Sequence, residues 1–417
     1  MTSPTKLPPR AWLIVGLLWA VGCFNYLDRV MITTMRGSLV EAIPMSDAQF
    51  GLLTSIFLWV YGALSPFAGF LADRFNRSRV IIGSLFAWSA ITWLTAHATT
   101  FGELLATRAL MGVSEACYIP AALALIADYH RGTTRSLATG VHMSGIMVGA
   151  GLGGLGGWIA ERQGWSHAFL IFGLAGIGYS VVLALLLRDA PNDDRTAAAS
   201  TANAFANVRL GEALASLFGR RSFVIALAYW GLLGLAGWAV VGWMPTYLNE
   251  QFHLSQGVAG LSATGYIQGA SLVGVLLGGW WADRWSRTNE RGRVLVPFIG
   301  LLLAVPGILV ASSVSVLPLA LAGLVLFGVT KAFTDPNMMP ILCSISDARF
   351  RATGYGVLNF FSCLIGGLSI YAGGALRDAH VNVRNIFFFG AFIAVVCATL
   401  LYFVKPQAAA NVAKPAR

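Results

Sequence analysis

Charged residues are scarce in this chain. Only 11% of its 417 residues are Asp, Glu, Lys or Arg, whereas 57% are hydrophobic. A soluble domain usually carries about 25% charged residues, so this chain has too little charge to cover a surface in water. The scarcity excludes an ordinary soluble domain and favours a protein embedded in a membrane.

Cysteine and catalytic motifs are scarce as well. The five cysteines all lie in apolar runs without paired spacing, which indicates small buried side chains rather than disulfides or metal ligands. The sequence contains no phosphate-binding loop, metal-ligand cluster or nucleophile–base set, and Asp189, Asp193 and Asp194 form a solvated charge run. We therefore expect no enzyme activity, no metal site and no cofactor.

Apolar runs long enough to span a bilayer, roughly 20 residues each, recur along the whole sequence. Backbone groups in lipid must be satisfied internally, and these runs are far too long for the strands of a β-barrel. The sequence therefore predicts an all-α membrane protein with twelve transmembrane helices, near 11–35, 48–72, 79–98, 103–126, 136–160, 166–187, 222–248, 257–282, 294–312, 316–342, 353–376 and 385–404.

The net charge of +10 is concentrated on one side of this predicted membrane protein. With twelve spans, 21 of the 28 Lys and Arg residues fall in the tails, loops and span ends of one side. Positively charged loops stay in the cytoplasm, so we expect both termini there, in a multi-pass protein of the cytoplasmic (inner) membrane. The same distribution argues against nucleic acid as a partner.

A charged signature occurs twice, 210 positions apart. It reads Gly-Phe-Leu-Ala-Asp-Arg-Phe-Asn-Arg from Gly69 to Arg77 and Gly-Trp-Trp-Ala-Asp-Arg-Trp-Ser-Arg from Gly279 to Arg287. Each copy follows the second span of a group of six, which indicates an internal duplication. Because a long polar interval separates the groups, we expect an N-terminal six-helix bundle, a cytoplasmic linker and a C-terminal six-helix bundle, at 1–187, 188–221 and 222–417. Parallel repeats that enclose a midplane site are a plan used by transporters.

These features resemble the major facilitator superfamily over essentially the whole chain. The family's loop motif, G-x-L-x-D-R-x-G-R-R/K, matches the first copy, with Asn76 in place of the central Gly. In that family the motif is a cytoplasmic gate latch, whose Asp and Arg pair across helices in one state and separate in the other. The resemblance thus implies a switch role for Asp73 and Asp283, with a plain loop salt bridge as the alternative, and it implies a monomer. The gating residues are then Gly69, Asp73, Arg74, Arg77, Gly279, Asp283, Arg284 and Arg287.

A finer resemblance is to the anion/cation symporter group, which imports sugar acids and other organic anions. The matching pieces are Asn25-Tyr26-Leu27-Asp28-Arg29, Arg108-x6-Glu115, Trp243-Met-Pro-Thr-Tyr-Leu248, Lys331 and Asn359. Spinster-like transporters are also similar, through the same Asp-Arg pair and the same Arg-x6-Glu spacing. Both groups remain open at this point.

Six ionisable residues stand out inside predicted spans, where charged groups are costly and are kept mainly for transport. They form three acid–base couples with a summed formal charge of zero: Asp28 and Arg29, Arg108 and Glu115, and Lys331 and Asp335. Arg108 and Glu115 are seven residues apart, about 10 Å along a helix, so they cannot pair directly and each should face a cavity at its own depth. Lys331 and Asp335 are four residues apart and can pair on one helix.

The two kinds of charge suggest a division of chemistry. An Arg stays charged and binds carboxylates through two hydrogen bonds, whereas a carboxyl group in a low-dielectric interior can hold a proton near neutral pH. We hypothesise that Arg29 binds the substrate carboxylate, as the matching position does in sugar-acid symporters. Asp28 and Glu115 would be the proton-coupling sites, with Arg108 tuning Glu115. The alternative is that these residues only cross-link the spans at 11–35 and 103–126.

Other polar residues are candidates for shaping the substrate site. Lys331 supplies a second positive charge to the substrate or is neutralised by Asp335 for stability. The segment 144–149 offers few hydrogen-bonding groups, so the expected substrate is a small organic anion, either a sugar acid or a less hydroxylated monocarboxylic acid. The remaining candidates are Tyr26, Arg108, His142, Gln268 and Asn359, although a lone histidine such as His142 is more often packed than functional.

A second function class is export of amphiphilic molecules by a spinster-like or multidrug-type transporter. Drug/proton antiporters of the superfamily carry the motif G-x8-G-x3-G-P-x2-G. This chain has Gly140, Gly149, Gly153 and Gly157 at that spacing, but Gly154 stands where the Pro belongs. The missing Pro counts against antiport, so the favoured prediction is proton-coupled symport of a small organic anion by alternating access.

Overall fold

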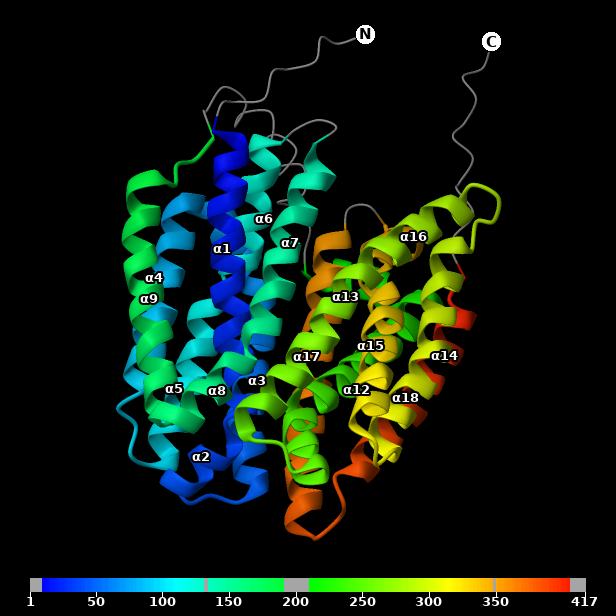
Figure 1. The fold of residues 1–417 in the computed structure, drawn as a ribbon. Coiled ribbons are helices and arrows are strands. Elements are labelled where there is room, and N and C mark those ends of the chain that lie inside the picture. Colours follow the sequence, from blue (N-terminus) through cyan, green and yellow to red (C-terminus); the bar gives the residue numbers. More distant parts are fainter. Residues whose placement is uncertain (1–9, 131–133, 191–209, 348–349, 406–417) are drawn as a thin grey trace, which may run out of the picture.

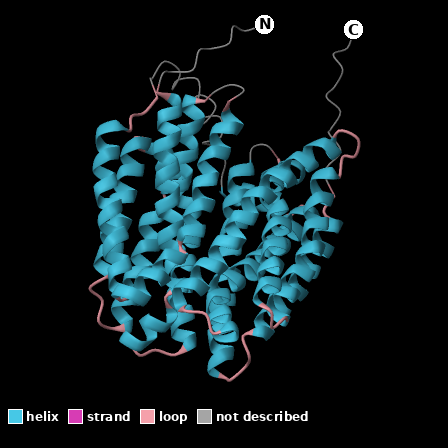
Figure 2. Ribbon diagram, in the orientation of Figure 1, coloured by secondary structure: helices cyan, strands magenta, loops and turns pink. Residues whose placement is uncertain are grey.

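The computed structural model describes residues 10–130, 134–190, 210–347 and 350–405, without the side chains of 68–74, 210 and 352. Within those ranges every regular element is a helix (Figure 2). This agrees with the sequence, because long apolar runs in lipid must satisfy their backbone groups internally.

The chain folds into two groups of helices that stand side by side (Figure 1). The first group comprises α1 (Ala11–Val30), η1 (Met31–Thr34), α2 (Arg36–Ala42), α3 (Asp47–Arg74), α4 (Arg77–Thr95), α5 (Phe101–Glu115), α6 (Tyr118–Tyr129), α7 (Arg135–Leu152), α8 (Gly154–Gln163) and α9 (Trp165–Leu186). The second comprises α12 (Arg221–Phe252), α13 (Gln256–Ser286), α14 (Gly292–Ser313), α15 (Leu317–Lys331), η2 (Ala332–Asn337), α16 (Met338–Ile345), α17 (Arg351–Asp378) and α18 (Arg384–Phe403).

Eleven helical stretches in the described residues are long and apolar enough to cross a membrane, one fewer than the sequence predicts. The predicted span 79–98 corresponds to α4, which is not among them. Two arginines in its first turn, Arg77 and Arg79, and several Ser and Thr residues lower its hydropathy. α4 nevertheless packs along α9 and against α5 inside the first group of helices.

Several predicted spans are interrupted rather than continuous. The run 103–126 divides into α5 and α6, because Pro120 has no N–H to donate and its ring clashes with the carbonyl of residue 116. The run 316–342 is likewise interrupted by η2, which contains Pro336. Glu115 and Lys331 are therefore the last residues of α5 and α15, at the breaks themselves.

The first span also changes geometry along its length. After Val30 the α-helix passes into the 3₁₀ segment η1, where the hydroxyls of Thr33 and Thr34 donate to the carbonyls of Val30 (2.8 Å) and Met31 (2.7 Å). Such side-chain bonds compete with the helical backbone pattern. Arg29 thus lies one residue before the end of α1.

The two groups meet along α3 and α17, and where α13 crosses α7 and α8. Small residues allow this approach. A Cβ added to Gly374 of α17 would lie 2.1 Å from the carbonyl oxygen of Asp47 in α3, and one added to Gly154 of α8 would lie 2.5 Å from the Cα of Leu261 in α13. At these crossings the backbones are therefore too close for any side chain.

The interval predicted as a linker, 188–221, contains the short helix α11 (Leu210–Phe218), and 191–209 lie outside the described residues. Asp189 is not a solvated charge as the sequence suggested. Its carboxylate accepts hydrogen bonds from the backbone N–H (2.9 Å) and the hydroxyl (2.7 Å) of Ser78, at the start of α4. Asp193 and Asp194 fall outside the described residues.

Candidate functional site

A buried ion pair joins α1 to α5. Nη2 of Arg29 lies 2.9 Å from Oε2 of Glu115, with side-chain exposures of 3% and 0%. The Asn25 amide donates to the same Glu115 oxygen at 2.9 Å, and its own oxygen accepts from Arg29 at 3.4 Å. The sequence analysis named Asn25 only as part of a motif. Asn25 is four residues from Arg29, about one helical turn, and this spacing could have predicted that both side chains belong to the site.

Aromatic rings enclose the Arg29 guanidinium. Its central carbon lies 4.5 Å from the ring centroid of Tyr26, 4.8 Å from Phe57 and 4.6 Å from Tyr61. Cations are stabilised over aromatic faces at these distances. Among the described residues, Nε of Arg29 and Oε1 of Glu115 have no hydrogen-bond partner, so the pair leaves hydrogen-bonding capacity on both sides.

Asp28 lies apart from this pair, as expected for adjacent residues that point about 100° apart on a helix. It is fully buried, and Oδ2 accepts a long hydrogen bond of 3.4 Å from Thr92 of α4. Within the described ranges, Oδ1 has no hydrogen-bond partner. A fully buried carboxyl group with one long hydrogen bond suits the neutral, protonated form better than the ionised form.

Arg108 is also fully buried, but it contacts backbone rather than a carboxylate. Its guanidinium donates to the carbonyls of Leu53 (3.3 Å), Asp28 (3.5 Å) and Arg29 (3.4 Å). The last two carbonyls belong to the C-terminal turn of α1, whose negative end favours a positive charge. Arg108 therefore holds the end of α1 against α3 and α5.

The expectation that Arg108 and Glu115 each face a cavity is wrong in this state. Both side chains have 0% exposure, because Arg29 and Asn25 cover Glu115 and the end of α1 covers Arg108. The structure instead brings four interior charges, Asp28, Arg29, Arg108 and Glu115, into one cluster between α1 and α5.

The C-terminal couple behaves as its spacing predicts. Nζ of Lys331 lies 3.2 Å from Oδ1 of Asp335, with side-chain exposures of 28% and 39%. The Thr334 hydroxyl also donates to this Asp335 oxygen, at 3.1 Å. Lys331 is therefore the accessible cation among the predicted interior positives, whereas Arg29 and Arg108 are enclosed.

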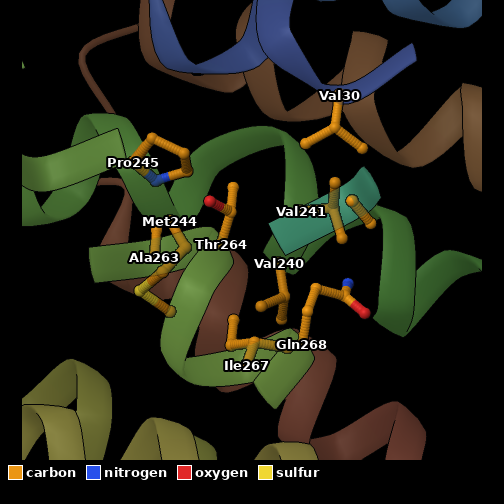
Figure 3. A pocket seen from close by; sticks show the side chains of 10 residues that line it. Val30, Val240, Val241, Met244, Pro245, Ala263, Thr264, Ile267 and Gln268 are labelled. Carbon is orange, nitrogen blue, oxygen red and sulfur yellow. The ribbon is translucent and has the colours of Figure 1, made fainter. Parts of the chain in front are cut away.

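A small pocket lies between the two groups of helices, beside the end of α1 (Figure 3). We call it the interface pocket, and it is lined by Val30, Ala150, Val240, Val241, Met244, Pro245, Ala263, Thr264, Ile267 and Gln268. Thr264 already donates to the carbonyls of Gly151 (2.8 Å) and Gly260 (3.0 Å). The amide of the predicted residue Gln268 is thus the main polar group that the lining offers.

Two predicted substrate residues lie elsewhere. His142 is fully buried and its Nδ1 donates to the carbonyl of Leu18 at 3.2 Å, so it packs α7 against α1 and does not line the interface pocket. Asn359 donates to the hydroxyl of Ser65 at 3.1 Å, which joins α17 to α3. Tyr26 stays near the site through its contact with Arg29.

The described residues of the repeated motif pair within their own half. Arg77 pairs with Asp128 of α6, and Asp283 accepts from Arg293 of α14 at 3.1 Å. Arg284 and Arg287 are exposed, and Gly279 packs near Pro336. Gly69, Asp73 and Arg74 are in the last turns of α3, and their side chains lie outside the described part of the structure.

A polar network at the opposite end was not predicted. Arg377 of α17 donates to Asp47 of α3 at 2.9 Å and to both carboxylate oxygens of Glu250, at 3.0 and 2.7 Å. Asp47 also pairs with Arg36, and Asp378 accepts the backbone N–H of Asp47 at 2.8 Å. We call these five residues the lower-end network, because α2, which carries Arg36, lies at the lower end of Figure 1. The sequence does contain a signal for this network, because these charged residues all lie near span ends on the side of the protein that has few Lys and Arg residues.

Comparison with known proteins agrees with this architecture. A family model described as Major Facilitator Superfamily matches residues 18–369 and, in a second match, 270–417. A bacterial homolog of the human lysosomal transporter Spinster, crystallised in an inward-facing and occupied conformation, superposes with a TM-score of 0.79 at 21% identity, covering 96% of this chain and 97% of that one.

Three of the similar proteins represent three transport classes. An MFS-type efflux pump of Mycolicibacterium smegmatis is 26% identical over 380 residues, which are 89% of this chain and 86% of the pump. A gallate transporter of Pseudomonas putida is 29% identical over 403 residues, 87% of this chain and 86% of the transporter. Protein spinster homolog 3 of Danio rerio is 29% identical over 324 residues; the match covers 72% of this chain but less than two thirds (63%) of that relative.

The resemblances to organic-anion transporters and to spinster-like transporters are both confirmed by these relatives. The family match extends over most of the sequence, and the fold and the membrane-length helices agree with it. The chain therefore belongs to the major facilitator superfamily, whose members are membrane transporters and not enzymes.

Proposed function

We propose that this protein is a proton-coupled symporter of a small organic anion that works by alternating access. The observation that carries the proposal is the buried Arg29–Glu115 ion pair, 2.9 Å long, at the ends of α1 and α5. Discontinuous helices near the bilayer midplane are where secondary transporters bind substrates and coupling ions. Here two such ends place a permanent cation against a protonatable carboxylate.

The coupling follows from competition for Arg29. While Glu115 is ionised, it pairs with the Arg29 guanidinium. An entering carboxylate then finds Arg29 already paired and is repelled by the negative charge of Glu115. Protonation of Glu115 removes that charge and frees Arg29 for the two-point hydrogen bonding that Arg makes with carboxylates. Anion and proton therefore bind with positive linkage, each raising the affinity for the other.

Asp28 supplies a second protonation site in this proposal. It is one residue from Arg29 and fully buried, and its carboxyl group contacts α4 rather than Glu115. The two carboxyl groups therefore have different hydrogen-bond partners, Thr92 for Asp28 and Arg29 with Asn25 for Glu115. Lys331, half-exposed at the end of α15, offers the anion a cation from the other half.

The interface pocket is too small for an acid in this state, but its lining suggests which acids this region accepts when it opens. Its lining is mostly apolar, with Gln268 as the main free hydrogen-bonding side chain. A polyhydroxylated sugar acid would lose hydrogen bonds to water there without replacement, which is costly. We therefore favour a monocarboxylic acid with an apolar or aromatic body. The gallate transporter among the relatives, which is named for an aromatic acid, supports this choice.

The wider setting is proposed on the same basis. The bundles 1–187 and 222–417 would rock about the site, joined by the interval 188–221, in the cytoplasmic membrane and as a monomer. The repeated motif with Asp73, Asp283 and their basic neighbours would latch the cytoplasmic end in the state opposite to this one. In the present structure its described ion pairs stay within one half.

The test uses proteoliposomes that contain a pH-sensitive dye and are challenged with sugar acids, aromatic acids and short carboxylates. We expect one class of acid to acidify the lumen. Asp28→Asn and Glu115→Gln should each abolish gradient-driven accumulation while exchange of preloaded substrate continues. Survival of accumulation in both variants would refute the proposal.

A second candidate function is export of amphiphiles, as in the efflux-pump relative. The apolar lining of the interface pocket favours it, because such a surface also suits lipid-like or drug-like molecules. The same proteoliposomes decide between the two. If no acid acidifies the lumen but cationic or lipid-like amphiphiles evoke a proton flux, the exporter is favoured.

A further inference from the structure

The polar side chains of α4 are arranged by face. Trp88 and Thr92 are four residues apart and therefore share one face, and Thr92 reaches Asp28 of α1. Ser89 lies on a neighbouring face, where it approaches Gly176 of α9. Thr95 bonds to the carbonyl of Ile91 in its own helix, at 2.7 Å. Of these polar side chains of α4, only those on the face of Trp88 and Thr92 are directed at Asp28.

Two potential hydrogen-bond donors converge on Asp28. The Thr92 hydroxyl is 3.4 Å from Oδ2, and the indole of Trp88 lies beside the same carboxyl group. Both side chains have 0% exposure. In the part of the chain that is described, the indole Nε1–H of Trp88 and Oδ1 of Asp28 both lack a hydrogen-bond partner. A buried donor and a buried acceptor on facing helices are therefore unsatisfied at the same time, which costs free energy.

The surroundings of Asp28 contain few other groups that could hold its charge. From α5 it faces the Glu115 carboxylate and the Arg108 guanidinium. Glu115 is already paired with Arg29, and Arg108 donates to backbone carbonyls, including that of Asp28 itself at 3.5 Å. On α4 it faces Thr92 and Trp88, which carry no charge. Direct hydrogen bonds to an ionised Asp28 carboxylate must come from α4.

We propose that Trp88 and Thr92 are positioning residues that hold the ionised form of Asp28. When the proton leaves, the carboxylate closes onto the indole N–H and the hydroxyl, and the two unsatisfied atoms become partners. When the proton returns, the neutral carboxyl group relaxes to the single long bond seen in this structure. The inference rests on the role of Asp28 as a proton site, which is part of the proposed function.

The test measures the protonation of Asp28 directly. Infrared spectra of the full-length protein in liposomes are recorded against pH, and the carbonyl band of the protonated Asp28 side chain is identified by its loss in Asp28→Asn. Trp88→Phe removes the N–H and keeps a ring against Tyr118, whose centroid lies 5.4 Å away. Thr92→Val removes the hydroxyl at nearly constant shape, and Thr95→Val is the matched control one turn further along.

We expect the pH at which half of this band is lost to rise by about one unit in Trp88→Phe and in Thr92→Val, because each loses one hydrogen bond to a charged group. Thr95→Val should leave the midpoint unchanged. Unchanged midpoints in both test variants, an equal shift in the control, or the absence of any band that depends on Asp28 would each overturn the inference.

The outcome is separable from that of the proposed function. The band requires no substrate, whereas symport is read from acidification of the liposome lumen by an added acid. A shifted band without acid-driven proton flux would leave the positioning role standing and remove the symport. Acid-driven flux with an unshifted band would leave the symport standing and remove the positioning role of Trp88 and Thr92.

Discussion

At the scale of single residues, the chemistry depends on which group satisfies Arg29. Its guanidinium has one charged partner, Glu115, and three aromatic neighbours, so it is held in place but bonded to a carboxylate through Nη2 alone. Nε has no partner within the described ranges. A second carboxylate can therefore use the free edge once Glu115 is neutral.

Replacement of Arg29 by Lys tests this geometry while keeping the charge. A Lys ammonium cannot make the planar two-point contact and stacks less well on aromatic rings. We expect the affinity for the transported anion to fall by at least tenfold, about 1.4 kcal/mol, with the protein still folded. Competition binding on detergent-solubilised protein measures it, and an affinity within a factor of two of the wild type would contradict this role.

Sequence reasoning found the charges of this site but not all of its contacts. The cost of burying Asp28, Arg29, Arg108 and Glu115 marked them as functional, and residue spacing predicted that Arg108 and Glu115 do not pair. That Arg29 pairs with Glu115, and that Arg108 turns to carbonyls, depends on how α1 is placed relative to α5. Helical periodicity within one span carries no information about that contact.

At the scale of helices, the breaks decide where the charges lie. Glu115 and Lys331 end α5 and α15, and Arg29 lies one residue before the end of α1. The sequence predicted continuous runs at these places. Pro120 and Pro336 were the available signals, since proline removes a helical hydrogen bond. The break in α1 had a weaker signal, because Thr33 and Thr34 bend a helix only when their hydroxyls turn back to the backbone.

We expect Arg108 to stabilise the folded protein as well as to support transport. It donates to three carbonyls from α1 and α3 in a fully buried place. Arg108→Met would remove these buried hydrogen bonds between α5, α1 and α3, so we expect the free energy of unfolding to fall by about 3 kcal/mol. Thermal unfolding in detergent measures the loss; a stability equal to the wild type would show that Arg108 acts only on the substrate.

Two glycines of α7 give a matched test of helix packing. A Cβ at Gly149 would lie 2.2 Å from the carbonyl oxygen of Cys23 in α1, whereas nothing lies within 4 Å of one at Gly140. Gly149→Ala should therefore destabilise the protein by about 1–3 kcal/mol through overpacking, and Gly140→Ala should be neutral or slightly stabilising. Equal effects in the thermal unfolding of both variants would show that α1 and α7 do not pack this closely.

At the scale of the whole molecule, the halves are joined at the end that carries the lower-end network. Each half keeps a neutral pair there: Arg36 with Asp47 in the first, and Arg377 with Glu250 in the second. Separation would break the Arg377–Asp47 contact and the bonds of Asp378 to the start of α3. Only the Asp378 carboxylate would lose its partners, and it is exposed, so this end can open at modest electrostatic cost.

Removing the charge of Asp47 should favour that opening. Asp47→Asn weakens its contacts with Arg377 and Arg36, and we expect the population open at this end to rise roughly tenfold, since charge-assisted bonds are the stronger ones. Distances between spin labels at positions 49 and 376 report the two states. Glu41→Gln, which removes an exposed negative charge from α2 at the same end, is the control. Identical distance distributions in Asp47→Asn and the wild type would refute the role of the network.

The overall architecture was the most predictable level. Composition and run length indicated a helical membrane protein, and the repeated motif of Gly69–Arg77 and Gly279–Arg287 indicated the family that the comparison shows. The contacts between halves were not predictable, because they join residues such as Asp47 and Arg377 that are far apart in sequence and carry no shared pattern. They depend on the conformational state as well as on the sequence.

The central claim is that proton and anion bind together through Glu115 and Arg29. The most direct measurement is the number of protons taken up per anion bound, obtained by titration calorimetry of the purified protein in buffers of different ionisation enthalpy. The account predicts net proton uptake in the wild type, with affinity rising as pH falls, and reduced uptake in Glu115→Gln. Zero uptake in the wild type, or uptake unchanged by Glu115→Gln, would contradict it.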